Sequence, residues 1–584
     1  MPGALPDERE RSYLWIPWFD RHWRPDFGRS ATAWERRAIS EMTQILTLPA
    51  RAITGKPMWP GSRRPLVRLA SLALLIGVTG VVMFAALYSP LKDDIAWLLY
   101  VARRWLAGRE LYVDLIEVNP PMIVWISAIP LTLARWWGMA AQTVTMPFLA
   151  AIVLACAAWS AWLARVRGGL FADWVPVFAL LGAVLLLIPA ADLGQREHLL
   201  VAAFLPYLII FARTLDGVRT PVAVSVGVGV LAALGCALKP QYGLAFAGLE
   251  ALALTRGLRP WRVAPFVAGI TLASYIALVA VTCPAYLRRA VPMALALYGA
   301  TDVTFWALLT DSAPLLLAEA LALVLVWHGR RATTGTFAQA LMVTGLTFTV
   351  MSNLVCFFDG KDWFYHRLPA SVVTVLVLIL WSARALPRRR ETWTRFVQCG
   401  MAMAVVALAL FAAAAVQRLE PEMREAVAPQ ATTVARLETL IRQNHARSYI
   451  AFSEWIALGF PVVNNTGVAW ASRFDSMWAL KGELWRAHID PAAAREWPIA
   501  RWVAHDFIAG CPDIAVVDTR EKGVNYIAVL VAADRSFGKV WSRYKQIVAF
   551  DGLTVYRRGK GGCVDPWVAA QGPNADPAPE VAIP

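Results

Sequence analysis

The sequence has few charged residues for its length. Only 17% of its 584 residues are Asp, Glu, Lys or Arg, whereas 58% are hydrophobic. Soluble domains usually carry about 25% charged residues, so this composition argues against a chain built only of soluble domains. The 27 tryptophans fit a membrane protein, because Trp is favoured where apolar side chains meet lipid headgroups. The composition therefore predicts an integral membrane protein.

Cysteine is also scarce. Seven cysteines are too few for a disulfide framework in a chain of this length. Cys511 and Cys563 share the C-terminal region and could form one disulfide if that region lies outside the cytoplasm, but the sequence leaves this pairing open. The other five lie in or beside apolar stretches and are expected to be inert: Cys156, Cys236, Cys283, Cys356 and Cys399.

Several catalytic signatures are absent. The sequence contains no Walker phosphate loop, no glycine-rich dinucleotide fingerprint, no HExxH and no paired-cysteine metal site, and its seven histidines show no ligand spacing. Chemistry on soluble nucleotide sugars or ATP is therefore unsupported. The net charge of +15 does not predict a nucleic-acid partner, because the excess lies in the N-terminal segment and in loops between apolar runs. The N-terminal segment shows no cleavable signal peptide.

Apolar runs recur along the chain. A helix needs about 20 residues to cross roughly 30 Å of hydrocarbon. The candidate runs cover approximately residues 68–88, 120–137, 142–164, 172–190, 198–213, 220–238, 242–256, 262–282, 308–327, 336–357, 366–385 and 397–416. This pattern predicts a polytopic α-helical membrane protein with about 11–13 transmembrane helices.

The arginines indicate how the helices are oriented. They cluster in alternate connections between the apolar runs, which the positive-inside rule places in the cytoplasm. These clusters are at 165 and 167, 213 and 219, 256 to 262, 330 and 331, and 384 to 390. The N-terminal segment is also basic and should be cytoplasmic, which places the segment after the first apolar run outside. From there to the cytoplasmic connection with Arg165 an odd number of crossings is required, but two apolar runs lie between them, so the run at 120–137 gives one crossing too many. That run is short and contains Pro130, so a juxtamembrane or re-entrant element is the alternative to a span.

The chain is expected to divide into four parts in a bacterial inner membrane. They are a cytoplasmic N-terminal segment (1–64), a transmembrane domain (65–416) whose first periplasmic loop is 89–119, a soluble periplasmic α/β domain (417–560), and a disordered tail (561–584) rich in Pro, Ala and Gly. In the soluble domain, Ser448–Phe452 and Ile514–Asp518 are short β-rich runs, and a helix is expected around Asn525–Ala533.

An acidic pair follows the first apolar run. Asp93 and Asp94 begin a segment with apolar residues at three-and-four spacing from Ile95 to Leu106, which predicts an amphipathic helix on the membrane surface that ends near Gly108. Two adjacent carboxylates repel each other, so the pKa of at least one should be raised, and such a group can act as a general base. The alternative is an ordinary helix N-terminus, where acidic residues meet the positive end of the dipole.

The residues that follow resemble a known superfamily. The stretch Ala102 to Asp114, ARRWLAGRELYVD, and the segment Glu117 to Met122, EVNPPM, resemble the first periplasmic loop of bacterial GT-C glycosyltransferases. That superfamily includes protein O-mannosyltransferases and the aminoarabinose transferase acting on lipid A. Its loop has an acidic pair, an A-x-x-x-L-x-G-x-x-x-Y-x-D stretch and a Pro-Pro. The match is close over residues 93–122 and does not specify a substrate.

The resemblance implies a glycosyltransferase that uses a polyprenyl-phosphate sugar and acts at the periplasmic face. Asp93 would be the catalytic base, with Asp94 beside it where glutamate is common in the superfamily. The base would take a proton from an acceptor hydroxyl or amine, and a single displacement would invert the anomeric centre. Some members use Mg²⁺ or Mn²⁺ and others no metal; for a bound cation, Asp93 and Glu197 are the expected ligands. The acceptor stays open among lipid A, polysaccharide, another glycolipid and protein.

Two further polar groups interrupt the apolar runs. Charges at a membrane boundary are costly unless they face an aqueous cavity. The first group is Asp192, Arg196, Glu197 and His198. The resembled superfamily has an acidic segment at this position, near the donor. A second group is expected to stabilise the negative charge of the leaving phosphate. It consists of Lys239, Lys361, His366 and Arg367, with Arg288 and Arg289 behind them. The alternative for the first group is a solvated turn at the membrane interface. The alternative for the second group is that its cations extend to lipid headgroups.

Two other functions fit a chain with many spans. A transporter or flippase of envelope lipids also carries charges within the membrane, but the sequence shows no convincing internal repeat, and transport needs no large terminal domain. A non-catalytic scaffold of envelope assembly would make the pair Asp93 and Asp94 dispensable. Both stay as alternatives to the glycosyltransferase, whose expected partners are membrane lipids and a periplasmic acceptor.

Overall fold

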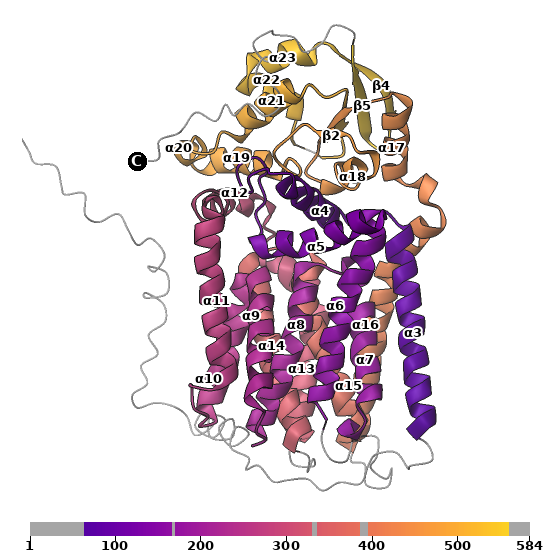
Figure 1. Cartoon of the computed structure of the whole chain (residues 1–584), viewed down its shortest axis with the longest axis vertical. Helices are drawn as coiled ribbons and strands as arrows, with labels where there is room; N and C mark the ends of the chain where they lie inside the picture. The colour runs from indigo at the N-terminus through magenta and orange to yellow at the C-terminus, as the bar shows by residue number, and fades with distance from the viewer. Residues whose placement is uncertain (1–63, 166–169, 330–335, 386–394, 522, 560–584) are drawn as a thin grey trace, which may run out of the picture. The chain divides into compact units, whose positions relative to one another are not determined.

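Long apolar helices dominate the transmembrane domain. The computed structural model describes residues 64–165, 170–329, 336–385, 395–521 and 523–559. In these residues, eight helices are long and apolar enough to cross a membrane. They are α3 (Arg64–Tyr88), α6 (Ala141–Leu163), α8 (Arg196–Leu215), α11 (Val263–Thr282), α13 (Phe305–Gly329), α14 (Thr336–Asp359), α15 (Phe364–Ala385) and α16 (Arg395–Val427). The chain is thus a multi-pass helical membrane protein (Figure 1).

Shorter helices complete this domain. They are α4 (Asp93–Leu106), α5 (Pro121–Trp137), α7 (Trp174–Leu187), α9 (Val222–Leu238), α10 (Gly243–Thr255) and α12 (Val291–Leu297). Every apolar run of the sequence therefore forms a helix. Helices α5, α7, α9 and α10 have 17, 14, 17 and 13 residues. These lengths are below the roughly 20 residues of an ordinary span.

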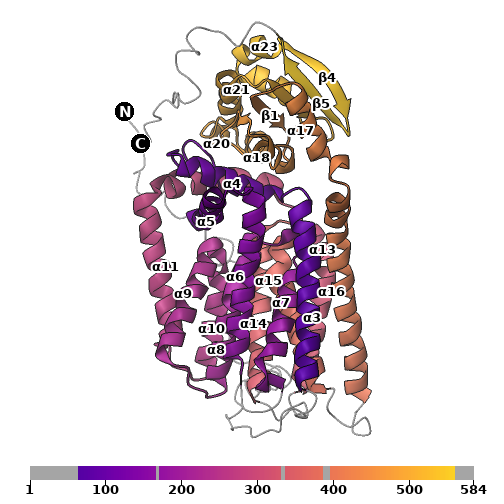
Figure 2. The ribbon, with the colours of Figure 1, turned by 45° about the vertical axis from the view of Figure 1, so that its right-hand side comes forward.

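Helix α5 packs beside α4 at one end of the helical bundle (Figures 1 and 2). It begins at Pro121, a position that suits proline because the N–H groups of the first helical turn have no partner within the helix and a missing one costs nothing. It also contains Pro130. It stops at Gly138, whose φ of 64° suits glycine. The juxtamembrane alternative for this run therefore agrees with the structure.

Glycines let neighbouring helices approach closely. A Cβ atom on Gly229 of α9 would lie 2.5 Å from the carbonyl oxygen of Ala264 on α11. A Cβ atom on Gly345 of α14 would lie 2.8 Å from a methyl group of Val377 on α15. Helices in lipid gain little from the hydrophobic effect and associate through close packing of small residues. Glycine is therefore required where these two helix pairs meet.

The C-terminal domain has a five-stranded sheet of order β2-β1-β3-β5-β4, in which β1 is parallel to β2 and β3, and β5 is antiparallel to β3 and β4. The strands are β1 (Ser448–Phe452), β2 (Ala469–Trp470), β3 (Ile514–Asp518), β4 (Tyr544–Phe550) and β5 (Leu553–Arg558). The helices are α17 (Thr433–Gln443), α18 (Val462–Thr466), α19 (Trp478–Ile489), α20 (Pro491–Ala494), α21 (Ile499–Gly510), α22 (Tyr526–Ala533) and α23 (Arg535–Trp541). The two predicted β-rich runs, now β1 and β3, and the predicted helix, now α22, are confirmed.

Aromatic side chains form the core of this domain. The ring of Phe452 on β1 lies 5.7 Å from that of Phe507 on α21 and 6.2 Å from that of Phe537 on α23. All three side chains are fully buried. Large aromatic rings contribute much of the burial that stabilises a small domain. The sheet and its covering helices are thus held together by one apolar cluster.

Helix α16 continues past the predicted boundary at residue 417 and ends only at Val427, so one uninterrupted helix connects the bundle to the C-terminal domain (Figure 2). The predicted N-terminal segment, apart from Arg64, and the predicted tail lie outside the described residues. Cys511 is disulfide-bonded. Its predicted partner, Cys563, lies outside the described residues as well.

Candidate active site

The acidic pair begins α4, which is covered on both sides. Residues 95–102 of this helix are all buried, whereas the sequence predicts one face toward lipid and one toward water. The predicted polar face packs on the C-terminal domain, because the rings of Trp97 and Tyr100 lie 5.0 and 5.1 Å from that of Phe460. Asn464 Nδ2 also donates to a backbone oxygen of α4 at 2.9 Å. Helix α4 is therefore held between the bundle and the soluble domain.

A cavity of about 320 Å³ lies where the two domains meet. From the bundle and its loops, the charged and aromatic lining residues are Asp94, Trp97, Glu117, Arg196, Tyr298, Asp302 and Trp363. From the C-terminal domain they are Glu454, Trp455, Asp475, Trp478 and Lys481. The cavity thus combines aromatic rings with carboxylates and two cations. This combination suits a small ligand with both apolar faces and hydrogen-bonding groups.

Asp94 is the member of the acidic pair that lines this cavity. Gln195 Nε2 donates to Asp94 Oδ2 at 2.9 Å, and Arg196 Nη2 lies 3.9 Å from Asp94 Oδ1. Both partners come from the start of α8, where unpaired backbone N–H groups also favour a negative charge. The acidic pair at the start of α4 and the charged segment at the start of α8 are therefore in contact through Asp94.

Asp93 is turned toward Lys92 instead and is not among the lining residues. Its Oδ1 lies 3.9 Å from Lys92 Nζ, which in turn lies 3.8 Å from Asp192 Oδ1. Burial, and then the charge of Asp94, raise the pKa of Asp93. Burial also raises the pKa of Asp192 to about 6. The sequence assigns the base to Asp93, but the structure brings only Asp94 to the cavity.

Glu197, which belongs to the group of Asp192, Arg196, Glu197 and His198, lies in a buried ion-pair cluster. Glu197 Oε1 lies 2.9 Å from Lys239 Nζ and 3.8 Å from His366 Nε2. His366 Nδ1 lies 3.1 Å from Asp359 Oδ2. His198 is buried, and its Nδ1 accepts a backbone N–H at 3.0 Å. None of these residues is among those that line the cavity. Lys239 therefore compensates the charge of Glu197, and neither Lys239 nor His366 faces the cavity.

The other predicted phosphate-binding residues are held by protein oxygens. Lys361 pairs with Asp302 and donates to a backbone oxygen at 2.6 Å, and burial lowers the pKa of Lys361. Arg367 donates to two backbone oxygens, one of them at 2.6 Å. Arg288 and Arg289 lie in a π-helical turn and are not among the lining residues. Of all the predicted cations, Arg196 is the one that lines the cavity.

Two tryptophan–carboxylate pairs in the cavity were not predicted. Trp97 Nε1 donates to Glu117 Oε2 at 2.5 Å, and Trp478 Nε1 donates to Asp475 Oδ1 at 2.8 Å. Each bond fixes the orientation of an indole ring at the cavity wall. Glu117 belongs to the EVNPPM segment, so the sequence marked its position without giving it a role. Asp475 and Trp478 carry no sequence signal, because their contact with the bundle is entirely tertiary.

Asp475 is expected to make stability depend on pH. Burial, and then the charge of Glu117, raise the pKa of Asp475 to about 8 from its ordinary value of 3.8. Between these values the folded protein holds a proton that the unfolded chain has released, so stability falls as pH rises, by about 1.4 kcal/mol per pH unit for one proton. Asp475→Asn removes this dependence. The Tm of wild type should therefore fall relative to the Tm of the variant from pH 5 to pH 8. A difference independent of pH would contradict the prediction.

Lys239→Ala is expected to destabilise the protein. Lys239 and Glu197 are 8% and 1% exposed, so removing the lysine leaves a buried carboxylate without its closest cation. Breaking a buried pair in this way costs about 3–5 kcal/mol. Adding Glu197→Gln should restore part of the loss, because the amide carries no charge. Thermal unfolding followed by tryptophan fluorescence measures both effects, and a single variant that melts with wild type would show that the pair contributes nothing.

The predicted metal ligands do not come together. Asp93 faces Lys92, and Glu197 is paired with Lys239. Among the residues that the structure describes, no group of three or more His, Cys, Asp and Glu could hold a metal ion. These side chains therefore do not fit Mg²⁺ or Mn²⁺ between Asp93 and Glu197.

Comparisons with known proteins found no match for this chain. No family model, no curated protein and no solved structure matches it. Its function is therefore inferred from the chemistry of the cavity and from the sequence of the loop that lines it.

Proposed function

We propose that this protein is a membrane glycosyltransferase of the GT-C type, which transfers a sugar from a polyprenyl phosphate to an acceptor at the periplasmic face of a bacterial inner membrane. The observation that carries the proposal is Asp94 in a cavity between the bundle and the C-terminal domain, with Arg196 beside it. The loop with the GT-C-like sequence lines the same cavity through Trp97, Glu117 and Asn119.

Asp94 is the proposed general base. Its carboxylate takes the proton of an acceptor hydroxyl as the hydroxyl oxygen attacks the anomeric carbon of the donor sugar. The bond between that carbon and the phosphate oxygen breaks, and its electron pair leaves with the polyprenyl phosphate. One displacement of this kind inverts the anomeric centre. Gln195 orients the carboxylate through its 2.9 Å hydrogen bond, and Asp93 supports the same helix end rather than reacting.

Arg196 is the proposed partner of the leaving phosphate. Its side chain lines the cavity and is 4% exposed, and its Nε has no hydrogen-bond partner among the described residues. A guanidinium held in place stabilises negative charge that grows on phosphate oxygens. Lys481 on α19 also lines the cavity and is paired with Glu454. Lys361 then holds Asp302 at the cavity wall, whereas Lys239, His366 and Arg367 hold buried carboxylates and backbone oxygens outside the cavity.

The C-terminal domain supplies the proposed acceptor side of the cavity. Trp455 is 59% exposed, whereas Trp478 is buried and fixed by Asp475. Sugar rings have apolar C–H faces that pack on aromatic rings, and hydroxyl groups that bond to carboxylates. The acceptor class stays open among lipid A, polysaccharide, glycolipid and protein.

A topology of eleven crossings accompanies this proposal. The eight long helices, the shorter apolar helices α7 and α9, and helix α10 would together make eleven crossings. This number lies within the predicted range of about 11–13. The arginine-rich connections would then face the cytoplasm, and the Asp94 cavity and the C-terminal domain would face the periplasm.

The proposal is tested with the full-length protein in vesicles. Polyprenyl phosphates carrying radiolabelled sugars are supplied together with lipid A, envelope polysaccharide, glycolipid and protein fractions. The label should move from the organic-soluble donor to one acceptor fraction, and free polyprenyl phosphate should accumulate. A flippase would instead move intact donor between leaflets, and a scaffold would do neither. Either of those two outcomes would overturn the proposal.

A further inference from the structure

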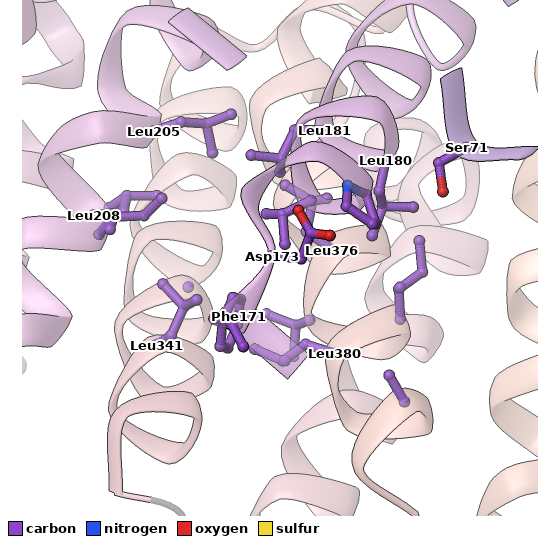
Figure 3. A pocket seen from close by; sticks show the side chains of 18 of the residues that line it. Ser71, Phe171, Asp173, Leu180, Leu181, Leu205, Leu208, Leu341, Leu376 and Leu380 are labelled. Carbon is purple, nitrogen blue, oxygen red and sulfur yellow. The ribbon is translucent and has the colours of Figure 1, made fainter. Parts of the chain in front are cut away.

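A second cavity, of about 310 Å³, lies among the membrane-spanning helices. Its walls come from α3, α7, α8, α14 and α15 and are almost entirely apolar. Figure 3 shows Leu180, Leu205, Leu341 and Leu376 around it. The cavity is therefore built to hold something without hydrogen-bonding groups.

This cavity is separate from the candidate active site. Helix α3 lines it with Arg64, Val67 and Ser71, all in its first turns. The acidic pair follows the other end of that helix, after Tyr88, and a helix of 25 residues is roughly 37 Å long. On α8, Arg196 opens the helix at the first cavity, whereas the second is lined from Leu205 onward, roughly 14 Å further along. A ligand here would not meet Asp94.

The cavity is bordered by a helix that exposes apolar side chains. Leu180 and Leu376 are only partly buried, so the cavity is not sealed by protein. Helix α3, which forms one wall, exposes Leu66, Leu69 and Ile76 by 68%, 67% and 71%, as expected for a helix bathed in hydrocarbon. Apolar cavities stay free of water and bind apolar groups. Hydrocarbon chains of the bilayer are the apolar groups that surround these helices.

Charged residues stand at one end of the cavity. Arg64 lines it and is exposed. Arg68 Nε donates to Asp173 Oδ2 at 2.6 Å, and the Arg68 side chain is still 52% exposed. Asp173 also caps α7 through the backbone N–H of Val175. These three side chains sum to one positive charge. Basic groups between helices at a membrane surface attract anionic lipid headgroups.

We infer that this cavity binds one acyl chain of an anionic glycerophospholipid from the surrounding leaflet, with its phosphate held by Arg64 and Arg68. A bilayer lipid presents the two required parts at the right separation, because its chain begins next to its phosphate. The polyprenyl donor is not the occupant, because its phosphate is needed at the Asp94 cavity, toward the opposite end of α3.

The inference is tested by lipid binding to the purified full-length protein. The protein is delipidated in detergent and titrated with phosphatidylglycerol or phosphatidylcholine of identical chains, and bound lipids are counted by native mass spectrometry. Wild type should bind one phosphatidylglycerol about fivefold more tightly than phosphatidylcholine, since one cation near a headgroup has an effect of that size. Arg64→Glu should abolish this preference. Leu376→Trp should fill the cavity and remove the site for both lipids.

A matched control separates the cavity from the general lipid-facing surface. Leu317 on α13 is 71% exposed, and Leu317→Trp makes the same change there. This variant should bind as wild type. Thermal unfolding confirms that the variants are folded before binding is compared. Equal binding of both lipids by wild type, or binding by a folded Leu376→Trp that matches wild type, would overturn the inference. Sugar transfer is not used as a readout, so the result does not depend on the proposed function.

Discussion

Asp94→Asn is expected to lower the rate of sugar transfer by about a thousandfold, the size of effect that a positioned general base has. The amide has nearly the same shape as the carboxylate, and its oxygen can still accept from Gln195, which donates to Asp94 at 2.9 Å. It cannot take a proton from the acceptor hydroxyl. The loss should therefore appear in kcat, with little change in KM for the donor. Steady-state kinetics with a radiolabelled polyprenyl-phosphate sugar measures both constants.

Asp93→Asn is the matched control. It makes the same chemical change one residue earlier, at a side chain that faces Lys92 and is not among the cavity residues. Lys92 keeps Asp192 as a partner at 3.8 Å, so the helix end should stay in place, and the rate should fall by less than about tenfold. A larger loss with Asp93→Asn than with Asp94→Asn would restore the assignment made from the sequence and remove Asp94 as the base.

Arg196→Ala is expected to lower kcat by about 10²–10³-fold, as the loss of one fixed donor to a developing anion does. The guanidinium lines the cavity and has an Nε without a partner among the described residues. Arg196→Lys should recover only part of the rate, because an ammonium lacks the planar fork that bonds two phosphate oxygens. Both variants are compared with wild type by donor turnover and by Tm.

Lys361→Ala is the control for this second prediction. Lys361 is also a buried cation near the cavity, but it pairs with Asp302 and a backbone oxygen and is not a lining residue. Its removal should affect stability more than kcat. An Arg196→Ala variant that is folded and turns over donor at the wild-type rate would exclude Arg196 as the partner of the phosphate.

The helices were predictable because their signal is local. A long apolar run has no other stable state in a bilayer than a helix, so every predicted run became one. Where the run was short and held Pro130, the sequence left two alternatives, because the packing of α5 against α4 is tertiary. The surroundings of α4 were not predictable, because the surface that covers Trp97 and Tyr100 includes Phe460, which lies far along the chain.

The site was predictable only as a set of segments. The sequence marked Asp94 and Arg196 as charges at membrane boundaries, and the structure brings them within 3.9 Å. The resemblance named Asp93 as the base, whereas the structure brings Asp94 to the cavity. Adjacent residues on a helix point about 100° apart, and the position of the cavity is tertiary, so the sequence alone could not show which of the two faces it. For the same reason, charge alone could not show that Lys239 pairs with Glu197 instead of facing the ligand.

The central claim is that Asp94 removes a proton while a sugar leaves its polyprenyl phosphate, and release of that lipid phosphate measures it most directly. Wild type and Asp94→Asn are placed in identical vesicles with one labelled donor and its acceptor, and free polyprenyl phosphate is counted over a single turnover. Wild type should release polyprenyl phosphate and glycosylated acceptor in equal amounts, whereas folded Asp94→Asn should bind the donor and release about a thousandfold less per unit time. Equal release by the two proteins would contradict the account.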